Sequence, residues 1–222
     1  MNDLEAIKNR RSIRKYKGKP IENEKREILE KLVQRCNEEG NLNIFICYDD
    51  PLGFDSKLAH YGNFYNVENY IDLSGTKSND LDIRAGYYGE KLVIEAQKLG
   101  LNTCWVALTF NKNRVKKFIN SDQSLVCVIA LGYGDEEGHV HKNKDISKIV
   151  TNTDDLDIEW FKKGVIASLL APTALNQQKF KIQRTDNKAI ISISGFGPYA
   201  RVDLGIVKYH FETASGHETT VF

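Results

Sequence analysis

The spacing of apolar residues along the chain predicts alternating helices and strands. Apolar residues recur at three- and four-residue intervals, which predicts helices at 24–36, 81–99, 158–169 and about 199–215. Short apolar or alternating stretches predict strands at 42–48, 67–75, 103–109, 125–133, 179–184 and 189–194, and the terminal ETTVF predicts a short one. Gly100 and Gly216 are placed to end two of the helices. The pattern indicates an α+β fold.

Two stretches interrupt this pattern. Residues 51–66 are rich in turn formers and aromatic residues, which predicts an exposed loop. Residues 135–155 are strongly polar and form the best candidate linker, although Ile146, Ile149 and Val150 indicate that it is partly docked.

The order of elements suggests an internal repeat. A shift of about 116 positions aligns Gly89 with Gly205, Gly100 with Gly216 and Thr103 with Thr219. Each half then reads as helix, strand, strand, long helix and short strand. This predicts a structural duplication, divided into residues 1–150 and a shorter half at 151–222. Two unrelated α+β segments remain the alternative.

Composition removes several classes of function. The 222 residues are 41% hydrophobic and 27% charged with a net charge of +1, so neither nucleic acid nor an anionic membrane is an expected partner. No apolar run is long enough to span a bilayer, and the first residues do not read as a secretion signal. The four cysteines lack CxxC spacing, so we expect core thiols in a cytoplasmic protein and no metal site.

A basic cluster, NRRSIRKY, follows the short N-terminal helix. Arg10, Arg11 and Arg14 flank Ser12, and guanidinium groups with a hydroxyl can clamp a phosphate. The alternative is a solvated basic helix end, which the helix dipole favours. Lysines of the polar stretch would add to a phosphate site only if the fold brings them beside these arginines.

Two loops of the last quarter have binding-site composition. APTALNQQKF, residues 171–180, presents three consecutive amides that suit a flat polar heterocycle, or that satisfy the loop's own backbone. SGFGPYA, residues 194–200, has GxGxxA spacing, but we reject a dinucleotide fingerprint. A dinucleotide-binding unit needs a further strand and an acidic residue downstream, and the proline removes a backbone donor.

Together these motifs resemble the flavin-dependent nitroreductase family. Its members begin with R-x-S-x-R, here Arg10, Ser12 and Arg14, and carry L-G-L-x-T-C-W, here residues 99–105. LGYGDEEGHVHKNKDISKIV is similar to the family's late segment, where a basic residue reaches the FMN phosphate. The resemblance covers most of residues 5–150. The family's P-S-x-x-N-x-Q-P-W loop is missing from its usual place, QRCNEEGNLNIF, and its counterpart is residues 172–178, followed by Lys179 and Phe180.

This displaced loop resembles a subgroup whose single chain imitates the family's homodimer. The resemblance implies a nitroreductase-like fold in which two degenerate repeats form an intramolecular pseudo-dimer around mixed sheets. One half would give the arginine motif and the other the proline–asparagine loop, holding one FMN rather than two. We therefore expect a monomer, with further self-association open.

The implied activity is that of an NAD(P)H-dependent flavin oxidoreductase acting on a small acceptor such as a nitroaromatic, a quinone or an enone. A non-catalytic flavin-binding or scaffold protein is the alternative. We expect the flavin to do the chemistry, with no certain catalytic side chain, although His60 or Tyr61 is a possible general acid. The implied cofactor-binding residues are Arg10, Arg11, Ser12, Arg14, Trp105, Ala107, Leu108, Lys142, Lys144, Pro172, Thr173, Asn176 and Gln178.

Their implied roles differ. Arg10, Ser12 and either Lys142 or Lys144 would serve the phosphate and ribityl side, and Arg14 would lie near N1 and the C2 carbonyl of the ring. Thr173, Asn176 and Gln178 would meet the pyrimidine or ribityl edge. Main-chain groups of Ala107 and Leu108, just beyond Trp105, would approach N5 and O4.

Overall fold

The chain packs into two compact units, and each unit is assembled from stretches that are not continuous in the sequence. The computed structural model describes residues 1–222, without the side chain of Leu58. Residues 10–81 and 92–140 form one unit, here called the arginine-motif unit, and residues 1–9, 82–91 and 141–222 form the other, here called the amide-loop unit. These units are defined by how the chain packs. The boundary at residue 150 was predicted from an internal repeat, and it stays a prediction.

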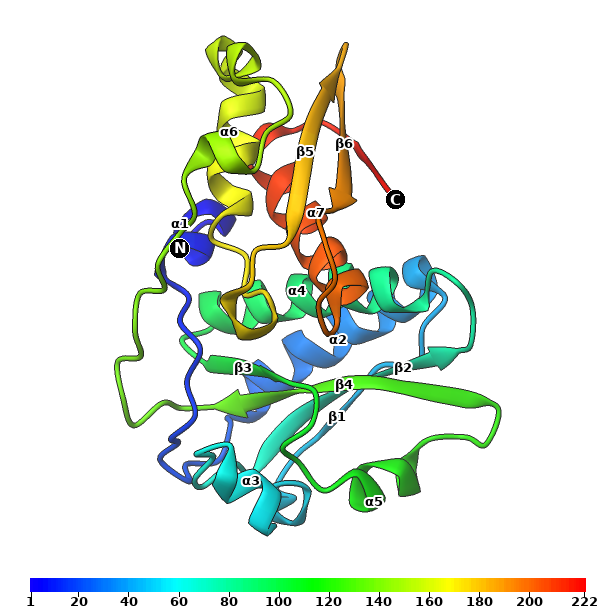
Figure 1. Ribbon diagram of the computed structural model, residues 1–222. Coiled ribbons are helices and arrows are strands. Elements are labelled where there is room, and N and C mark those ends of the chain that lie inside the picture. Colours follow the sequence, from blue (N-terminus) through cyan, green and yellow to red (C-terminus); the bar gives the residue numbers. More distant parts are fainter. The chain divides into compact units, whose positions relative to one another are not determined.

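The arginine-motif unit is built on a four-stranded antiparallel sheet in the order β1-β2-β4-β3. Its elements are α2 (Asn23–Gly40), β1 (Phe45–Cys47), α3 (Lys57–Tyr61), β2 (Asn69–Thr76), β3 (Asn102–Val106), α5 (Lys112–Val115) and β4 (Gln123–Gly132). Helix α4 (Leu81–Lys98) begins and ends in this unit, and its residues 82–91 belong to the other. Figure 1 shows α2 on one face of the sheet and α3 and α5 on the other.

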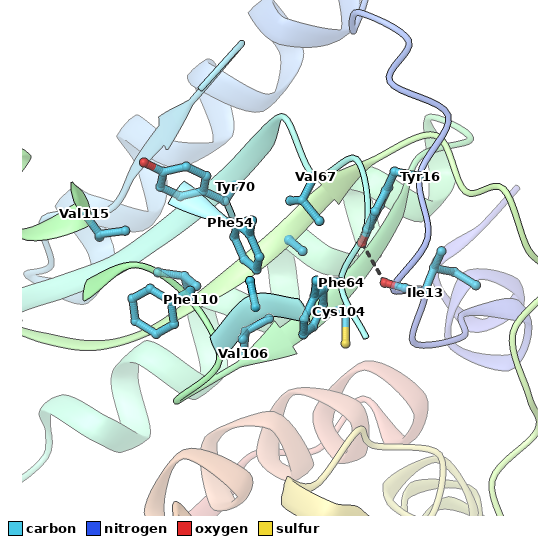
Figure 2. Close-up of a cluster of buried hydrophobic side chains, with 13 residues drawn as sticks. Ile13, Tyr16, Phe54, Phe64, Val67, Tyr70, Cys104, Val106, Phe110 and Val115 are labelled. Carbon is cyan, nitrogen blue, oxygen red and sulfur yellow. Dashed lines mark hydrogen bonds between the residues drawn. The ribbon is translucent and has the colours of Figure 1, made fainter. Parts of the chain in front are cut away.

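A hydrophobic core of this unit lies between the sheet and the two helices α3 and α5 (Figure 2). Aromatic rings dominate it: Phe54 lies 5.3 Å from Phe64 and 5.9 Å from Tyr70 between ring centroids. The Tyr16 hydroxyl donates to the Ile13 carbonyl over 2.8 Å, so the arginine-motif segment is anchored in the same core. Residues 51–66, predicted to be an exposed loop, therefore contain a short helix and supply Phe54 and Phe64 to the core.

The amide-loop unit contains a three-stranded mixed sheet in the order β5-β6-β7. Its elements are α1 (Asp3–Asn9), α6 (Glu159–Ser168), β5 (Phe180–Thr185), β6 (Lys188–Ile193), α7 (Ala200–Ser215) and β7 (Thr219–Val221). Helix α7 packs on α6, β6 and β7. It also crosses the 82–91 segment of α4, where a Cβ on Gly205 would lie only 2.0 Å from the Ile83 carbonyl oxygen.

The predicted elements and their ends are largely confirmed. Gly216 has φ 70° and its N–H donates to the Glu212 carbonyl, so it ends α7, and Gly100 with φ 74° follows α4. The polar stretch 135–155 is partly docked as predicted, because Val150 pairs with Ile182 of β5 and is buried. Within the part of the chain that the structure describes, no helix has the length and apolar character needed to cross a membrane.

The two sheets share a sequence of strand directions. β1 is antiparallel to β2, and β2 and β3 run in the same direction because both are antiparallel to β4. In the same way β5 is antiparallel to β6, and β6 is parallel to β7. A long helix joins the second and third strands of each set, α4 in one and α7 in the other. The strands β1, β2 and β3 differ from β5, β6 and β7 in one respect: β4 lies between β2 and β3, whereas β6 pairs directly with β7.

Candidate functional site

The arginine motif lies beside β3. Ser12 pairs with Thr103 in a parallel bridge, and the Ile13 N–H donates to the Thr103 carbonyl over 3.0 Å. Ile13 is fully buried, so this pairing is locked by the core. The structure thus brings together the two stretches RRSIR and NTCWV, which lie far apart in the sequence.

Residues 134–138 hold the same segment by its backbone. The Glu136 carboxylate accepts the N–H of Arg14 over 2.9 Å and that of Lys15 over 3.3 Å, and the Lys15 carbonyl accepts the Asp135 N–H. Gly138 has φ 71°, and a Cβ there would lie 2.7 Å from Ile13 Cδ1, so only glycine fits this close approach. The backbone of the motif is therefore fixed from two sides.

The guanidinium groups of the motif occupy different environments. Arg10 is only 4% exposed, whereas Arg14 is exposed and its guanidinium lies 6.0 Å from the centre of the Phe64 ring. Arg11 donates to the Arg10 carbonyl over 2.8 Å. Burial raises the pKa of the Cys104 thiol, and the nearby Arg14 and Arg10 offset part of that rise. Two guanidinium groups thus lie near the Ser12–Cys104 edge, and the Glu136 carboxylate, which acts on the Cys104 pKa in the opposite direction, lies there too.

The predicted residues after β3 lie where the strand leaves the sheet. Trp105 is half-buried in β3, which ends at Val106. Ala107 is half-buried and the Leu108 side chain is 58% exposed.

The proline–asparagine loop lies in the amide-loop unit and adopts an unusual backbone. Its centre is a 3-10 turn, Ala174–Asn176. Leu175, Asn176 and Gln178 all have positive φ, at 53°, 51° and 44°. Left-handed backbone at a leucine is costly and persists only where the surroundings enforce it. The contacts of this loop supply that enforcement.

Lys142, Lys144 and the loop form one network of amides. Gln178 Oε1 accepts the Lys144 N–H over 2.8 Å, and its Nε2 donates to the Lys142 carbonyl and to Asn176 Oδ1 over 3.2 and 2.8 Å. Asn176 Nδ2 also donates to the Lys142 carbonyl over 2.8 Å. Gln178 is almost fully buried, and its N–H donates to the Thr173 hydroxyl over 3.1 Å. The Gln178 amide therefore bonds the protein itself and fixes the loop.

Sequence reasoning missed the residues that anchor this loop to α7. Asp203, 6% exposed, accepts the Ala174 N–H over 2.9 Å and Gln177 Nε2 over 2.8 Å. Gln177 Nε2 also donates to the Pro198 carbonyl over 2.9 Å. Burial raises the pKa of the Asp203 carboxyl to about 6. The available signal was an acidic residue between Val202 and Leu204 on the buried face of a predicted helix.

Two other predictions fall outside these groups. Tyr61, in α3, is 84% exposed, and His60 stacks on Tyr65 at 6.1 Å between ring centroids. Their role as general acids stays a prediction. In SGFGPYA, Gly195 with φ 100° turns the chain from β6 towards α7, and the Phe196 side chain is fully exposed.

The predicted cofactor-binding residues thus form two separate groups, one within each unit. The arginine-motif unit brings together Arg10, Arg11, Ser12 and Arg14 with β3 and its C-terminal end. The amide-loop unit brings together Lys142, Lys144, Thr173, Asn176 and Gln178, and Pro172 precedes them in the same loop.

Solved structures with a similar fold include proteins described as nitroreductases. A putative nitroreductase from Thermotoga maritima matches with a TM-score of 0.69 and 24% identity, over 96% of this chain and 83% of that chain. An FMN-dependent nitroreductase from Clostridium difficile matches with a TM-score of 0.54 and 25% identity, over 68% and 99% of the two chains. A putative nitroreductase in complex with FMN from Desulfovibrio desulfuricans has a TM-score of 0.54 and 16% identity, over 67% and 95%.

The sequence itself assigns the family. Residues 2–215 match the family described as "Putative TM nitroreductase". A search of curated proteins found no match. Because the family match extends over almost the whole chain, and the structure shares its fold with nitroreductases, the chain belongs to this nitroreductase family.

Proposed function

We propose that this protein is an FMN-dependent oxidoreductase that passes electrons from NAD(P)H to a small acceptor such as a nitroaromatic, a quinone or an enone. The observation that carries the proposal is the arginine motif along β3, with Arg10 buried beside the Ser12–Thr103 pairing. Guanidinium groups next to a hydroxyl suit a phosphate monoester. Relatives described as FMN-dependent or as holding FMN support FMN as the ligand.

In the arginine-motif unit we assign Arg10, Arg11 and Ser12 to the phosphate and ribityl chain. Arg14, at the exposed end of the motif, would stabilise negative charge at N1 and the C2 carbonyl. The main chain of Ala107 and Leu108 would bond N5 and O4, and Trp105 would support that turn.

In the amide-loop unit we assign Lys142 or Lys144 to the phosphate and Asn176 to the pyrimidine or ribityl edge. Thr173 can still donate its hydroxyl proton, since its oxygen accepts the Gln178 N–H. Gln178 and Pro172 would shape the loop, because the Gln178 amide is committed to Lys142, Lys144 and Asn176.

FMN supplies the hydride chemistry when it is bound, and the protein supplies binding, orientation and charge. We assign no catalytic acid, base or nucleophile to the chain. Protons for the acceptor would come from water, and the preorganised donors would set the ring's orientation before an acceptor arrives.

We further propose that each chain is a pseudo-dimer with one FMN. The shared strand directions of β1-β2-β3 and β5-β6-β7 support a duplication. Only the first half carries R-x-S-x-R and only the second carries the proline–asparagine loop, which supports a single site. The expected state is a cytoplasmic monomer.

The test starts from the purified protein. A yellow protein with about one FMN per chain, bleached by NAD(P)H without oxygen and reoxidised by a quinone or nitroaromatic, supports the proposal. Flavin that NAD(P)H cannot bleach would indicate a non-catalytic flavin-binding protein. Two FMN per chain would refute the shared site, and a chain that neither contains nor binds FMN would refute both functions.

A further inference from the structure

Four lysines gather where residues 142–151 run beside β5. Val150 pairs with Ile182, and the Ile182 N–H donates to the Ile149 carbonyl over 2.7 Å. This pairing brings Lys144 and Lys148 of the polar stretch close to Lys179 and Lys181. All three of the other lysines lie near enough to Lys144 to lower its pKa, in addition to the larger effect of its burial. We call Lys144, Lys148, Lys179 and Lys181 the lysine cluster.

Main-chain carbonyls hold three of the four amino groups. Lys144 Nζ donates to the Gln178 carbonyl over 2.7 Å, Lys181 Nζ to the Val150 carbonyl over 3.5 Å, and Lys179 Nζ to the Phe196 carbonyl. In the part of the chain that the structure describes, none of the four forms an ion pair with a carboxylate. A carbonyl fixes an ammonium group without neutralising its charge. The cluster is therefore positioned and still cationic.

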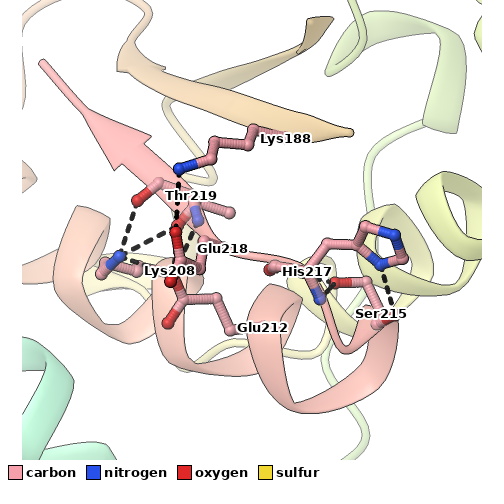
Figure 3. A network of polar contacts seen from close by, with 7 residues as sticks. All are labelled: Lys188, Lys208, Glu212, Ser215, His217, Glu218 and Thr219. Atoms are coloured by element: carbon pink, nitrogen blue, oxygen red, sulfur yellow. Dashed lines mark hydrogen bonds and ion pairs between the residues drawn. The ribbon is translucent and has the colours of Figure 1, made fainter. Parts of the chain in front are cut away.

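Several other cations of the same unit are paired with carboxylates. Lys188 lies 2.9 Å from Glu218 and Lys208 lies 2.6 Å from Glu212 (Figure 3). Arg184, on the same strand as Lys181, lies 2.9 Å from Asp155. Asp145 is the acid beside the cluster: its Oδ1 accepts from Ser147, and it lies near Lys148, so one carboxylate stands against four lysines. Like charges at close range repel, so an anion is the missing counterpart.

We propose that Lys148, Lys179 and Lys181 of the lysine cluster bind the 2′-phosphate of NADPH, and thereby select NADPH over NADH as the reductant. This inference rests on the proposed function. A phosphate monoester carries nearly two negative charges near neutral pH, and lysines bind it as point charges without a fixed geometry. Lys148, Lys179 and Lys181 lie outside the residues assigned to FMN. NADH lacks only this phosphate, so the cluster has no anion to meet when NADH binds.

The experiment compares the two nucleotides on the FMN-loaded protein. Lys148→Gln, Lys179→Gln, Lys181→Gln and their triple combination are compared with Lys188→Gln, a lysine of the same unit that is paired with Glu218. We expect the kcat/KM ratio for NADPH over NADH to fall about threefold for each single variant and roughly tenfold to thirtyfold for the triple. The control keeps the wild-type ratio. Added salt should reduce the ratio of the wild type but hardly that of the triple variant.

A binding measurement separates this inference from the proposed function. Adenosine 2′,5′-bisphosphate should bind the wild type more tightly than AMP in calorimetry, and the triple variant should lose that difference. A wild-type protein without a preference for NADPH and for the bisphosphate overturns the inference and leaves the oxidoreductase standing. Loss of FMN from the triple variant with an unchanged nucleotide ratio would assign the cluster to the flavin phosphate instead, which also overturns it. A protein without FMN and without NAD(P)H oxidation overturns the proposed function and the selection of NADPH with it.

Discussion

The Nε2 atom of His210 lies 2.8 Å from Oε1 of Glu90, and both side chains are completely buried. The other ring nitrogen, Nδ1, lies 3.0 Å from the Ala167 carbonyl. Since a carbonyl can only accept, Nδ1 carries a hydrogen, and a single proton is shared between Nε2 and the Glu90 carboxyl. The pair joins α7 to the 82–91 segment of α4.

This sharing predicts how substitutions of Glu90 behave. Glu90→Ala leaves the buried imidazole without its partner and should lower the free energy of unfolding by about 3–5 kcal/mol. Glu90→Gln can still donate to Nε2 of a neutral ring, so its loss should be about 1–2 kcal/mol. Urea unfolding of both variants at pH 7 checks this. Equal losses would show that packing alone, and not the shared proton, sets the stability of the contact.

The crossing of α7 with α4 predicts a strong effect at Gly205. A Cβ there would lie 2.0 Å from the Ile83 carbonyl oxygen and 2.7 Å from the Tyr87 nitrogen. Because both are backbone atoms, the helices themselves must move, and Gly205→Ala should cost about 3 kcal/mol, the upper end for overpacking. Gly195→Ala is the control. No atom lies within 4 Å of a Cβ added at Gly195, so only its φ of 100° makes a side chain unfavourable there. Its expected cost is about 1 kcal/mol, and similar thermal shifts for the two variants would argue against the close crossing.

Asp72 predicts a dependence of stability on pH. It is fully buried in β2, and burial raises its pKa to about 7, although the nearby Ser74 hydroxyl offsets part of the rise. The folded state therefore binds a proton more tightly than the unfolded chain, whose Asp pKa is about 4. The contribution of Asp72 is complete below pH 4 and is lost as the pH rises through 7, on the order of 4 kcal/mol in total.

Asp72→Asn removes this titration. We expect the free energy of unfolding of the variant to change much less between pH 4 and 7 than that of the wild type, with the variant gaining most relative to wild type above pH 7. Asp203, whose pKa is raised to about 6, keeps a smaller slope of the same sign in both proteins. Parallel pH profiles for the two proteins would contradict the assignment of the slope to Asp72.

Local patterns predicted most helices and strands, and the exceptions have physical reasons. Residues 57–61 carry no apolar stripe of helical period, and α3 exists because its surroundings, including Phe54 and Phe64, pack into the core. The close approach of Gly205 to Gly86, where α7 crosses α4, joins residues far apart in the sequence, and the repeat alignment made no prediction about it.

The candidate site was less accessible to sequence reasoning. The motif residues were found one by one, but the bridge between Ser12 and Thr103 depends on how Ile13 enters the core. The amides of the loop suggested a ligand, yet the Gln178 amide forms its hydrogen bonds with Lys142, Lys144 and Asn176. Such networks join residues far apart in the chain, and composition carries no information about which amide meets which carbonyl.

The bond between Gln177 and Asp203 predicts a test of the loop's role. Asp203→Asn turns an NH₂ towards Gln177 Nε2, so one hydrogen bond is lost and the loop loosens. We expect FMN to bind about tenfold more weakly. The double variant Asp203→Asn/Gln177→Glu should recover only part of that loss, because the amide introduced at position 203 then donates to a carboxylate while the bond to the Pro198 carbonyl is lost. Asp186→Asn, in the exposed β5–β6 turn, is the control. Quenching of flavin fluorescence measures the affinity, and a double variant weaker than either single one would contradict the bond's role.

Arg10 predicts the largest loss of flavin affinity. Its guanidinium is buried at the start of the motif, close enough to Cys104 to affect the pKa of the thiol. A charge-assisted hydrogen bond to phosphate contributes about 1.5–3 kcal/mol, so Arg10→Ala should weaken FMN binding roughly tenfold to 150-fold. Riboflavin, which lacks the phosphate, should bind the variant and the wild type alike. Arg35→Ala, an exposed arginine of α2, controls for net charge, and thermal unfolding of the flavin-free proteins controls for the loss of a buried side chain. Equal weakening of FMN and riboflavin would remove Arg10 from the phosphate and leave it a structural role.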